Sequence, residues 1–245
     1  MSLGRLVAIM ERLRDPVRGC EWDRAQDFAT IAPYTIEEAY EVADAIARGD
    51  MAHLADELGD LQLQVVFHAQ MAREAGHFTL DEVIAGVCDK LERRHPHIFG
   101  DADHSPGWEN IKAGERGERG HASAFDGVAL ALPALERAAK LQRRAARTGF
   151  DWPDASGPLA KIHEELDEIA HSTSDEERAE ELGDLLFAVV NFARHLKIDP
   201  EEALRRANRK FEARFRAIES TPGFSNCDLE EMERRWQAAK HSNKA

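Results

Sequence analysis

The sequence predicts an all-α protein built from two tandem helical domains. Its apolar residues recur at helical spacing, and no stretch alternates as a half-buried strand does. Aromatic residues make up only 7% of the chain, and helix-favouring Ala, Leu, Glu and Arg dominate. The strongest observation is an internal repeat, because residues 55–72 (ADELGDLQLQVVFHAQMA) reappear closely at residues 179–197 (AEELGDLLFAVVNFARHLK).

The first half contains four predicted helices. They are expected at residues 3–14, 36–48, 51–74 and 79–94. A loop precedes the second helix, for which Thr30 or Thr35 is the expected N-cap. The fourth helix is expected to end at His95, because the proline that follows disfavours helix in the residue before it.

The second half repeats this order. Its helices are expected at residues 133–147, 156–170, 179–197 and 199–219. Smaller features recur too, since GFDWP at 149–153 matches GCEWD at 19–23, and Trp236-x-x-x-Lys240 matches Trp108-x-x-x-Lys112. A stretch rich in Gly, Asp and Ser separates the halves and is expected to hold one short helix, at 108–116. We therefore expect an N-terminal domain at 1–98, a linker at 99–129 and a C-terminal domain at 130–245.

Charge and composition exclude several classes of function. The formal net charge of -14 argues against binding duplex nucleic acid or an anionic membrane, and it suits a protein that binds divalent cations. The three cysteines are scattered without a CxxC pair, which indicates neither a disulfide framework nor a zinc site. No apolar run reaches transmembrane length and no signal-peptide pattern is present, so a cytoplasmic location is expected.

Each half carries an E-x-x-E motif on one predicted helix and an E-x-x-D motif on the next. Acids three residues apart project from the same side of a helix, and a short turn makes the two helices antiparallel neighbours. Four carboxylates can then converge, a ligand set that fits Mg²⁺, with Mn²⁺ as the alternative, better than zinc. For one helix alone, acids in a solvated first turn remain an equal alternative, and the repeat favours the metal site. The acids are Glu38, Glu41, Glu57 and Asp60 in the first half and Glu165, Glu168, Glu181 and Asp184 in the second.

Two further features accompany the acids. A glycine inside a strong helical pattern costs roughly 1 kcal/mol relative to alanine, so Gly59 and Gly183 predict close backbone packing between the acids. Lys210 and Arg214 lie one helical turn apart and suit phosphate oxygens, although such a pair alone is more often a solvated helix face. Together with the acids, they predict a metal-dependent site for a polyphosphate.

With these motifs the chain resembles the two-domain form of the MazG-type nucleoside triphosphate pyrophosphohydrolases. The family signature is E-x-x-E followed at a limited distance by E-x-x-D, and both halves contain it. The flanking stretches RRHPHIFGD, PALERAAKLQRRAARTGFDW and NRKFEARF are also similar, so the resemblance covers nearly the whole chain. It implies Mg²⁺-dependent hydrolysis of NTP and dNTP to the monophosphate and pyrophosphate. It also implies a homodimer in which paired helices from two subunits complete four-helix bundles.

The resemblance assigns roles to individual residues of the second half. Glu165, Glu168, Glu181 and Asp184 are expected to bind Mg²⁺. Lys161, Lys210 and Arg214 are expected to contact phosphates, with Trp236 near the nucleotide. The metals would activate a water for in-line attack, and the general base is expected to be Glu164 or Glu165.

The first half has the same acids, Glu38, Glu41, Glu57 and Asp60, as a second metal set, and its phosphate candidates are Lys90, Arg93 and Arg94. Four residues before the matching glutamate, however, it has Tyr34 where the second half has Lys161. We therefore expect the C-terminal site to be the principal catalyst.

Three alternatives remain at this stage. A di-iron carboxylate bundle would use Glu92-x-x-His95 and Glu168-x-x-His171, but both histidines lie at helix ends. A non-catalytic nucleotide or alarmone sensor could use the same site, although a pure binder needs fewer acids facing an anion. A helical scaffold with acidic faces would make the repeated motif an accident. Four phenylalanines are expected in the core rather than stacked on a base: Phe187, Phe192, Phe211 and Phe215. Four histidines are expected in the core or at the surface rather than as ligands: His68, His77, His97 and His195.

Overall fold

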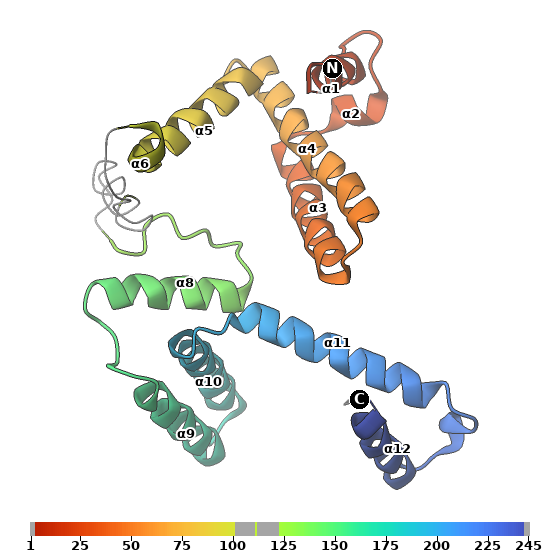
Figure 1. Cartoon of the computed structure of the whole chain (residues 1–245), viewed down its shortest axis with the longest axis vertical. Coiled ribbons are helices and arrows are strands. Elements are labelled where there is room, and N and C mark those ends of the chain that lie inside the picture. Colours follow the sequence, from red (N-terminus) through yellow and green to blue (C-terminus); the bar gives the residue numbers. More distant parts are fainter. Residues whose placement is uncertain (1–2, 101–110, 112–122, 243–245) are drawn as a thin grey trace. The chain divides into compact units, whose positions relative to one another are not determined.

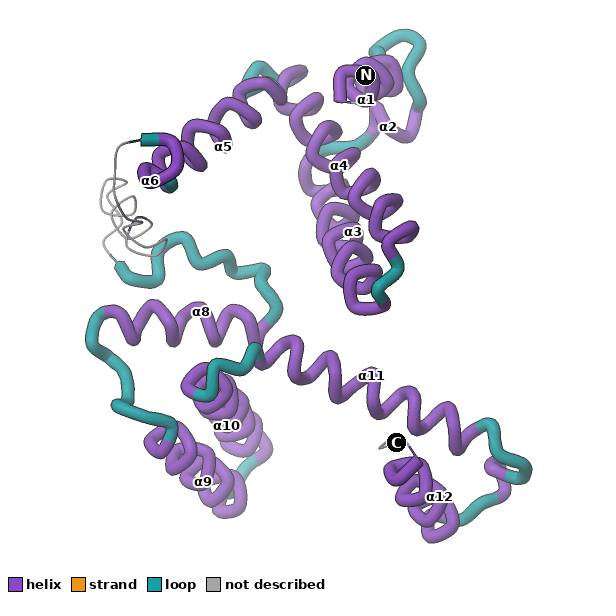
Figure 2. The backbone as a smooth tube through the Cα atoms, viewed as in Figure 1, coloured by secondary structure: helices purple, strands orange, loops and turns teal. Residues whose placement is uncertain are grey.

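The computed structural model describes residues 3–100, 111 and 123–242 and divides into two units, Met1–Gly114 and Glu115–Ala245. Every regular element in these described residues is helical (Figures 1 and 2), so the all-α prediction is confirmed. The domain limits at 98 and 130 stay predictions. The short helix expected at 108–116, with Trp108 and Lys112, lies outside the described residues apart from Ile111.

The first unit begins its long helical hairpin earlier than the sequence suggested. Its helices are α1 (Leu3–Leu13), α2 (Glu21–Ala25), α3 (Phe28–Arg48), α4 (Met51–Glu74), α5 (Leu80–Arg94) and α6 (Pro96–Phe99). The N-cap of α3 is Asp27, whose side chain accepts a hydrogen bond from the Thr30 amide at 2.8 Å. The Thr30 hydroxyl in turn accepts from the Asp27 amide at 2.9 Å, so Thr30 is the third helical residue and not the cap. Pro33 lies in the second turn, where its missing amide removes a single helical hydrogen bond.

The hairpin of α3 and α4 is the frame of the first unit (Figure 1). Gly49 ends α3 with φ of 69°, a left-handed conformation that glycine adopts without strain. Asp50 caps α4 by accepting from the His53 amide at 3.1 Å. The buried core joins α1, α3 and α4 through a cluster of Met10, Ile31, Val66, Phe67 and Met71.

The second unit repeats the hairpin. Its elements are α8 (Ala134–Arg147), α9 (Ser156–His171), α10 (Asp175–His195), α11 (Pro200–Glu219), η1 (Phe224–Asn226) and α12 (Leu229–Ser242). α9 packs against α10, and α8 contacts α10 and α11. α10 begins four residues before the expected start because Ser174 caps it, accepting from the Glu177 amide at 3.1 Å. Acids in its first turn, such as Asp175, also favour the helix dipole.

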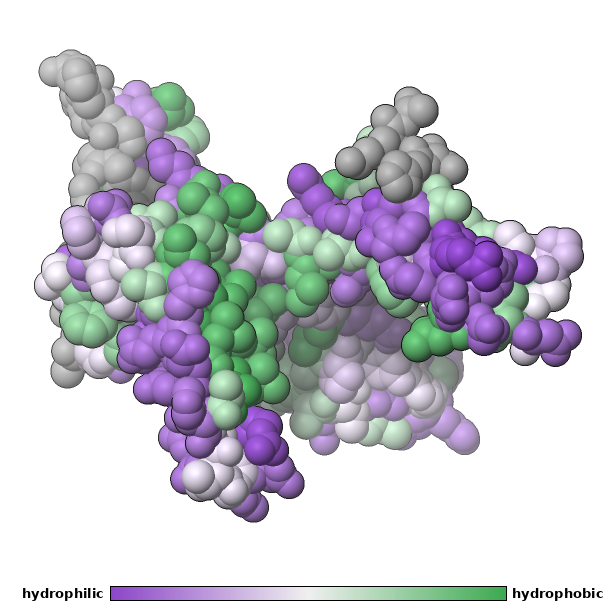
Figure 3. Space-filling model, turned by 90° about the horizontal axis from the view of Figure 1, so that it is seen from below, coloured by the Kyte–Doolittle hydropathy of each residue, from purple (hydrophilic) through white to green (hydrophobic). Residues whose placement is uncertain are grey.

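Much apolar surface of the helices is exposed in the single chain. In α10 the buried residues are Ala188, Val190 and Asn191, whereas Leu186 and Phe187 are 51% and 44% exposed. Figure 3 shows apolar side chains gathered at the surface. The prediction of core positions was therefore wrong for Phe187, and also for Phe211 and Phe215 on α11, which are 57% and 38% exposed.

The two motif glycines do not mark close packing within the chain. A Cβ atom added to Gly59 or Gly183 would meet nothing within 4 Å. That prediction was wrong, because the side of each helix on which a Cβ would project is open in the described part of the chain. Among the described residues, no helix has the length and apolar content needed to cross a membrane.

Candidate active site

The second hairpin buries one glutamate against one lysine. Glu165 on α9 is 1% exposed, and its Oε1 lies 2.6 Å from Nζ of Lys161, one turn earlier on the same helix. The same ammonium lies 2.7 Å from Oε1 of Glu164, which is exposed. Burying a carboxylate is costly unless it is paired, so Lys161 is what holds Glu165 in place here.

Glu165 belongs to a cluster of three acids from the two helices. Glu165, Glu168 and Glu181 each offer one carboxylate oxygen, and these oxygens all lie within 4.8 Å of one another. The second oxygen of Glu165, Oε2, is buried and accepts no hydrogen bond from a nitrogen or hydroxyl donor of the described residues. A buried acceptor without a donor is costly, and a cation at this place would satisfy it. We call these three residues the second-unit triad.

The triad is electrostatically unbalanced. The Lys161 ammonium holds the pKa of the Glu165 carboxyl below its ordinary value. The pKa of Glu168 is raised, first because its protonated form hydrogen bonds to Glu165 and then by desolvation and by the charge of Glu165. Desolvation and the charge of Glu168 also raise the pKa of Glu181. Since the acids oppose one another's ionisation, and carboxylate oxygens are the ligands of hard divalent cations, the triad fits such a cation.

The first hairpin carries an equivalent triad. One carboxylate oxygen from each of Glu38, Glu41 and Glu57 lies within 4.8 Å of the others. Glu57 is 7% exposed, and its Oε1 lies 3.0 Å from Nε2 of His53. Desolvation is the largest cause of a raised pKa at both Glu38 and Glu57, followed by the charge of Asp60 for Glu38 and of Glu41 for Glu57.

The fourth acid of each motif stands apart. Asp60 and Asp184 were expected to converge with the glutamates, but the structure includes neither in its triad. Both are near enough to act through their charge, since Asp60 raises the pKa of Glu38 and Asp184 that of Glu181. Asp184 instead lines a cavity that also contains Lys161 and Glu165.

The other basic and aromatic candidates lie away from the triads. Lys210 and Arg214 are on α11, and Trp236 on α12 packs against Phe211 with ring centroids 5.2 Å apart. None of these three candidates lines the cavity. Arg214 Nε is buried and has no hydrogen-bond partner among the described residues. The first-unit candidates Lys90, Arg93 and Arg94 lie on α5. Their roles stay predictions.

The histidines give no support to a di-iron site. His95 Nδ1 lies 2.7 Å from the Leu91 carbonyl oxygen, and His171 Nδ1 lies 2.6 Å from that of Asp167. Both rings are thus engaged with the backbone of their own helix, and the metal-type clusters in the described residues contain only glutamates.

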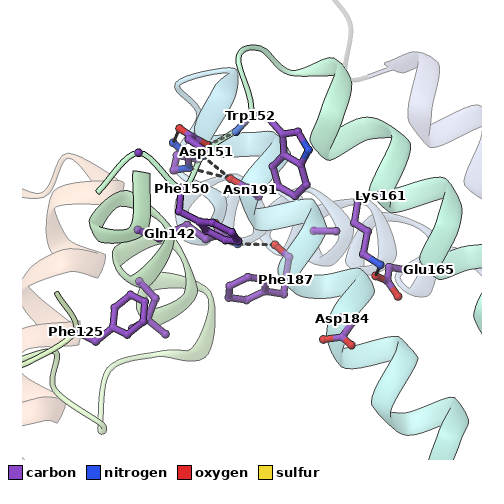
Figure 4. Close-up of a pocket in the computed structure, with 15 residues that line it drawn as sticks. Phe125, Gln142, Phe150, Asp151, Trp152, Lys161, Glu165, Asp184, Phe187 and Asn191 are labelled. Atoms are coloured by element: carbon purple, nitrogen blue, oxygen red, sulfur yellow. Dashed lines mark hydrogen bonds and ion pairs between the residues drawn. The ribbon is translucent and has the colours of Figure 1, made fainter. Parts of the chain in front are cut away.

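A cavity of about 750 Å³ adjoins the second-unit triad. Figure 4 shows one end of it carrying charged side chains, which we call the charged end: Lys161, Glu165 and Asp184. The other end, which we call the aromatic end, is lined by the following aromatic and amide side chains: Phe125, Gln142, Phe150, Trp152, Phe187 and Asn191. The sequence analysis noted GFDWP as a repeated segment and as part of a stretch similar to the family, and these two signals could have pointed to the aromatic end.

Ion pairs and one close contact fix the wall of the cavity. Arg194 Nη1 donates to Asp151 Oδ2 at 2.9 Å, and the His195 ring nitrogen lies 3.1 Å from Asp151 Oδ1. The Arg194 hydrogen bond is the main reason that the pKa of Asp151 is lowered. A Cβ atom at Gly157 would lie 2.1 Å from Trp152 Cδ1, so this glycine is what lets the indole pack against α9.

Comparison with known proteins agrees with this arrangement. The model of the MazG nucleotide pyrophosphohydrolase domain matches residues 26–99 and 157–218, one segment in each unit and together more than half of the chain. A nucleoside triphosphate pyrophosphohydrolase of Escherichia coli is 50% identical over 98% of this chain and 97% of its own length.

Two further relatives extend the comparison. The Thermotoga maritima protein named nucleoside triphosphate pyrophosphohydrolase/pyrophosphatase MazG is 46% identical over 96% of this chain and 94% of its own length. The uncharacterized protein YabN of Bacillus subtilis is 42% identical over 97% of this chain and 51% of its own length. With both helical hairpins inside the matched segments, the chain belongs to the MazG nucleotide pyrophosphohydrolase family.

Proposed function

We propose that the chain hydrolyses nucleoside triphosphates, NTP and dNTP, to nucleoside monophosphate and pyrophosphate in a Mg²⁺-dependent reaction. The observation that carries the proposal is the second-unit triad, whose buried Glu165 has an unsatisfied oxygen beside a cavity with both a cationic and an aromatic part. Family membership and the names of the close relatives support the same activity.

The residues that would hold Mg²⁺ are Glu165, Glu168 and Glu181, with Asp184 as a ligand from the cavity side. When bound, Mg²⁺ supplies charge neutralisation at the phosphates and lowers the pKa of a bound water. Lys161 carries its positive charge at the edge of the cavity, where it would pair with phosphate oxygens. Lys210, Arg214 and Trp236 are proposed as the further phosphate and nucleotide contacts that α11 and α12 provide.

The reaction breaks the bond between the α-phosphorus and the oxygen that bridges to the β-phosphate. A water oxygen forms the new bond to the α-phosphorus, its proton passes to a carboxylate, and pyrophosphate leaves with the bridging oxygen. The proposed acceptors are Glu165, which lines the cavity, and Glu164, which shares the Lys161 ammonium. Glu164→Gln distinguishes them, because only the role of Glu164 predicts a loss of kcat in that variant.

We further propose that the second unit is the principal catalyst. The buried glutamate of its triad, Glu165, is paired with Lys161. The buried glutamate of the first-unit triad, Glu57, is paired with His53, which is charged only if it is protonated. The first-unit set of Glu38, Glu41, Glu57 and Asp60 would then bind metal chiefly in a supporting role.

A homodimer is proposed as well, because exposed apolar residues such as Leu182 and Leu186 on α10 are 50% and 51% exposed in the single chain. Burying apolar surface of this kind drives association. Light scattering of the protein and of Leu186→Arg tests this, since a monomeric wild type would contradict the proposal.

The activity is tested by incubating the protein with each NTP and dNTP plus Mg²⁺ and separating orthophosphate from pyrophosphate. Glu181→Gln and the matched first-unit variant Glu57→Gln are assayed in parallel. We expect monophosphate and pyrophosphate, lost in Glu181→Gln and kept in Glu57→Gln. Diphosphate and orthophosphate would show that the cleavage position is wrong. Tight Mg²⁺-dependent binding without turnover would show a nucleotide sensor instead.

A further inference from the structure

The cavity beside the second-unit triad is larger than a triphosphate needs and changes character along its length. At about 750 Å³ it is in the range of pockets that enclose a whole small ligand. Lys161, Glu165 and Asp184 lie at the charged end, and the other charged lining residues, Asp151 and Arg194, are paired with each other. A ligand that fills the cavity therefore has an anionic part and a flat apolar part.

The aromatic end presents rings from three different segments. Phe150 and Trp152 come from the loop before α9, Phe187 comes from α10, and Phe125 precedes α8. Phe150 is 82% exposed, which places a large apolar ring in solvent, where it gains nothing in the free chain. Stacking against a base would cover such rings, and each base–aromatic contact changes affinity by about fivefold to a hundredfold.

One polar atom at the aromatic end has no partner. Gln142 on α8 is only 6% exposed and lines the cavity. Its Nε2 donates to the Phe187 carbonyl oxygen at 2.8 Å, which fixes the orientation of the amide (Figure 4). Its Oε1 is buried and has no hydrogen-bond partner in the part of the chain that the structure describes. Such an orphaned acceptor in a ligand cavity is satisfied when a ligand brings an N–H group to it.

The neighbouring amide differs in this respect. Asn191 Oδ1 already accepts from Arg194 Nε at 2.9 Å and from Nη2 at 2.7 Å. Arg194 is in turn held by Asp151. The Asn191 amide oxygen is therefore already used within the protein, whereas Gln142 Oε1 can accept a hydrogen bond from a ligand.

We propose that the aromatic end binds the nucleobase of the substrate, and that Gln142 Oε1 accepts a hydrogen bond from an N–H group of the base edge. The inference rests on the proposed function for the position of the phosphates, and it adds the site that holds the base. Gln142 is then a specificity residue, and Phe150, Trp152 and Phe187 form the stacking surface.

The test compares Gln142→Met with Gln64→Met. The two glutamines are matched, because Gln64 on α4 is 8% exposed, also has a buried Oε1 without a partner, and does not line the cavity. Phe150→Ala is the second cavity variant, since truncating an 82% exposed side chain leaves the fold intact. For each protein we would measure KM and kcat for ATP and the inhibition constant of inorganic tripolyphosphate, which has no base. The dissociation constant of AMP is measured by calorimetry in the presence of a chelator.

We expect Gln142→Met to raise KM for ATP and Kd for AMP by about tenfold, with kcat and tripolyphosphate inhibition unchanged. Its Tm should change little, because the substitution removes the unsatisfied Oε1 together with the hydrogen bond from Nε2 to the Phe187 carbonyl oxygen. Phe150→Ala should also raise KM for ATP and Kd for AMP, whereas Gln64→Met should change neither constant.

Failure of the base site and failure of the proposed function give different results. No AMP binding to the wild type, or unchanged AMP and ATP constants in both cavity variants, would overturn the base site even if ATP is hydrolysed. A wild type that binds AMP through Gln142 but does not hydrolyse ATP would refute the proposed activity and keep the base site.

Discussion

The pairing of Lys161 with Glu165 leads to a quantitative prediction for Lys161→Met. Removing one partner of a buried ion pair typically costs about 3–5 kcal/mol, because the other charge is left buried. Glu165 is 1% exposed, but the Lys161 side chain is 36% exposed, so solvent already screens part of the interaction. We therefore expect a loss of about 2–3 kcal/mol at neutral pH without metal.

The assay is the thermal unfolding of the second unit, followed by calorimetry with a chelator present. For a unit of this size each 1 kcal/mol moves Tm by about 3–5 °C, so Lys161→Met should lower Tm by about 6–15 °C. Added Mg²⁺ should recover most of the loss, because a cation in the triad neutralises Glu165 as the ammonium does. The matched control is Tyr34→Phe, at the equivalent position of the first unit, which keeps the edge contact with Trp22 and should change little.

Two outcomes would refute this reasoning. An unchanged Tm in the chelator would mean that Glu165 does not depend on Lys161, for example because it is already protonated in the free protein. A lowered Tm that Mg²⁺ does not restore would mean that the triad does not hold the cation next to Glu165.

Three further predictions follow from the same structure. The pKa values of Glu168 and Glu181 are raised on folding, so without metal the stability they contribute is present at low pH and is lost as pH rises through the raised values. Because Mg²⁺ needs the ionised acids, its gain in Tm should be larger at pH 7 than at pH 4.5, and an equal gain would contradict the triad as its site. Asp27→Ala should destabilise the first unit by about 1 kcal/mol through loss of the α3 cap, measured by urea unfolding; no change would show that the cap is dispensable. Gly157→Ala should displace the Trp152 ring and raise KM for ATP more than it lowers kcat, and unchanged kinetics would remove Trp152 from the base site.

The sequence predicted the hairpins well because their signals are local and repeated. Apolar periodicity and the E-x-x-E and E-x-x-D spacing are properties of one helix and its neighbour, and the structure brings three of the four acids together in each unit. The start of α3 was missed because Asp27, like the expected caps Thr30 and Thr35, is a residue type that caps helices. Only the reciprocal hydrogen bonds of Asp27 and Thr30 identify the cap.

The aromatic end was missed for a different reason. Gln142 and Phe187 are 45 residues apart, and nothing in the local pattern of either predicts their hydrogen bond. From the sequence alone, a glutamine on an amphipathic helix cannot be distinguished from an ordinary surface residue, because its burial depends on neighbours that are distant in the sequence. Asp184 shows the same limit, because helical spacing puts it on the side of Glu181 but does not say that it faces the cavity.

In each unit a basic residue lies beside the buried glutamate, and the two basic residues come from different helices of the hairpin. In the second unit the lysine lies on the first helix of the hairpin, four residues before Glu165. In the first unit the basic residue is His53, on the second helix, four residues before Glu57. The residue that corresponds to His53 in the second unit is Glu177, which instead accepts from the Thr173 amide at 2.8 Å at the start of α10.

The difference between Lys161 and His53 is the reason that we expect the two similar triads to differ in activity. Hydrogen bonds to Glu164 and Glu165 raise the pKa of Lys161 and so favour its charged form. The partner of Glu57 is instead an imidazole, which is charged only if it is protonated. The second unit is therefore organised before metal or nucleotide arrives, and it places the Lys161 ammonium at the edge of a cavity with room for a base.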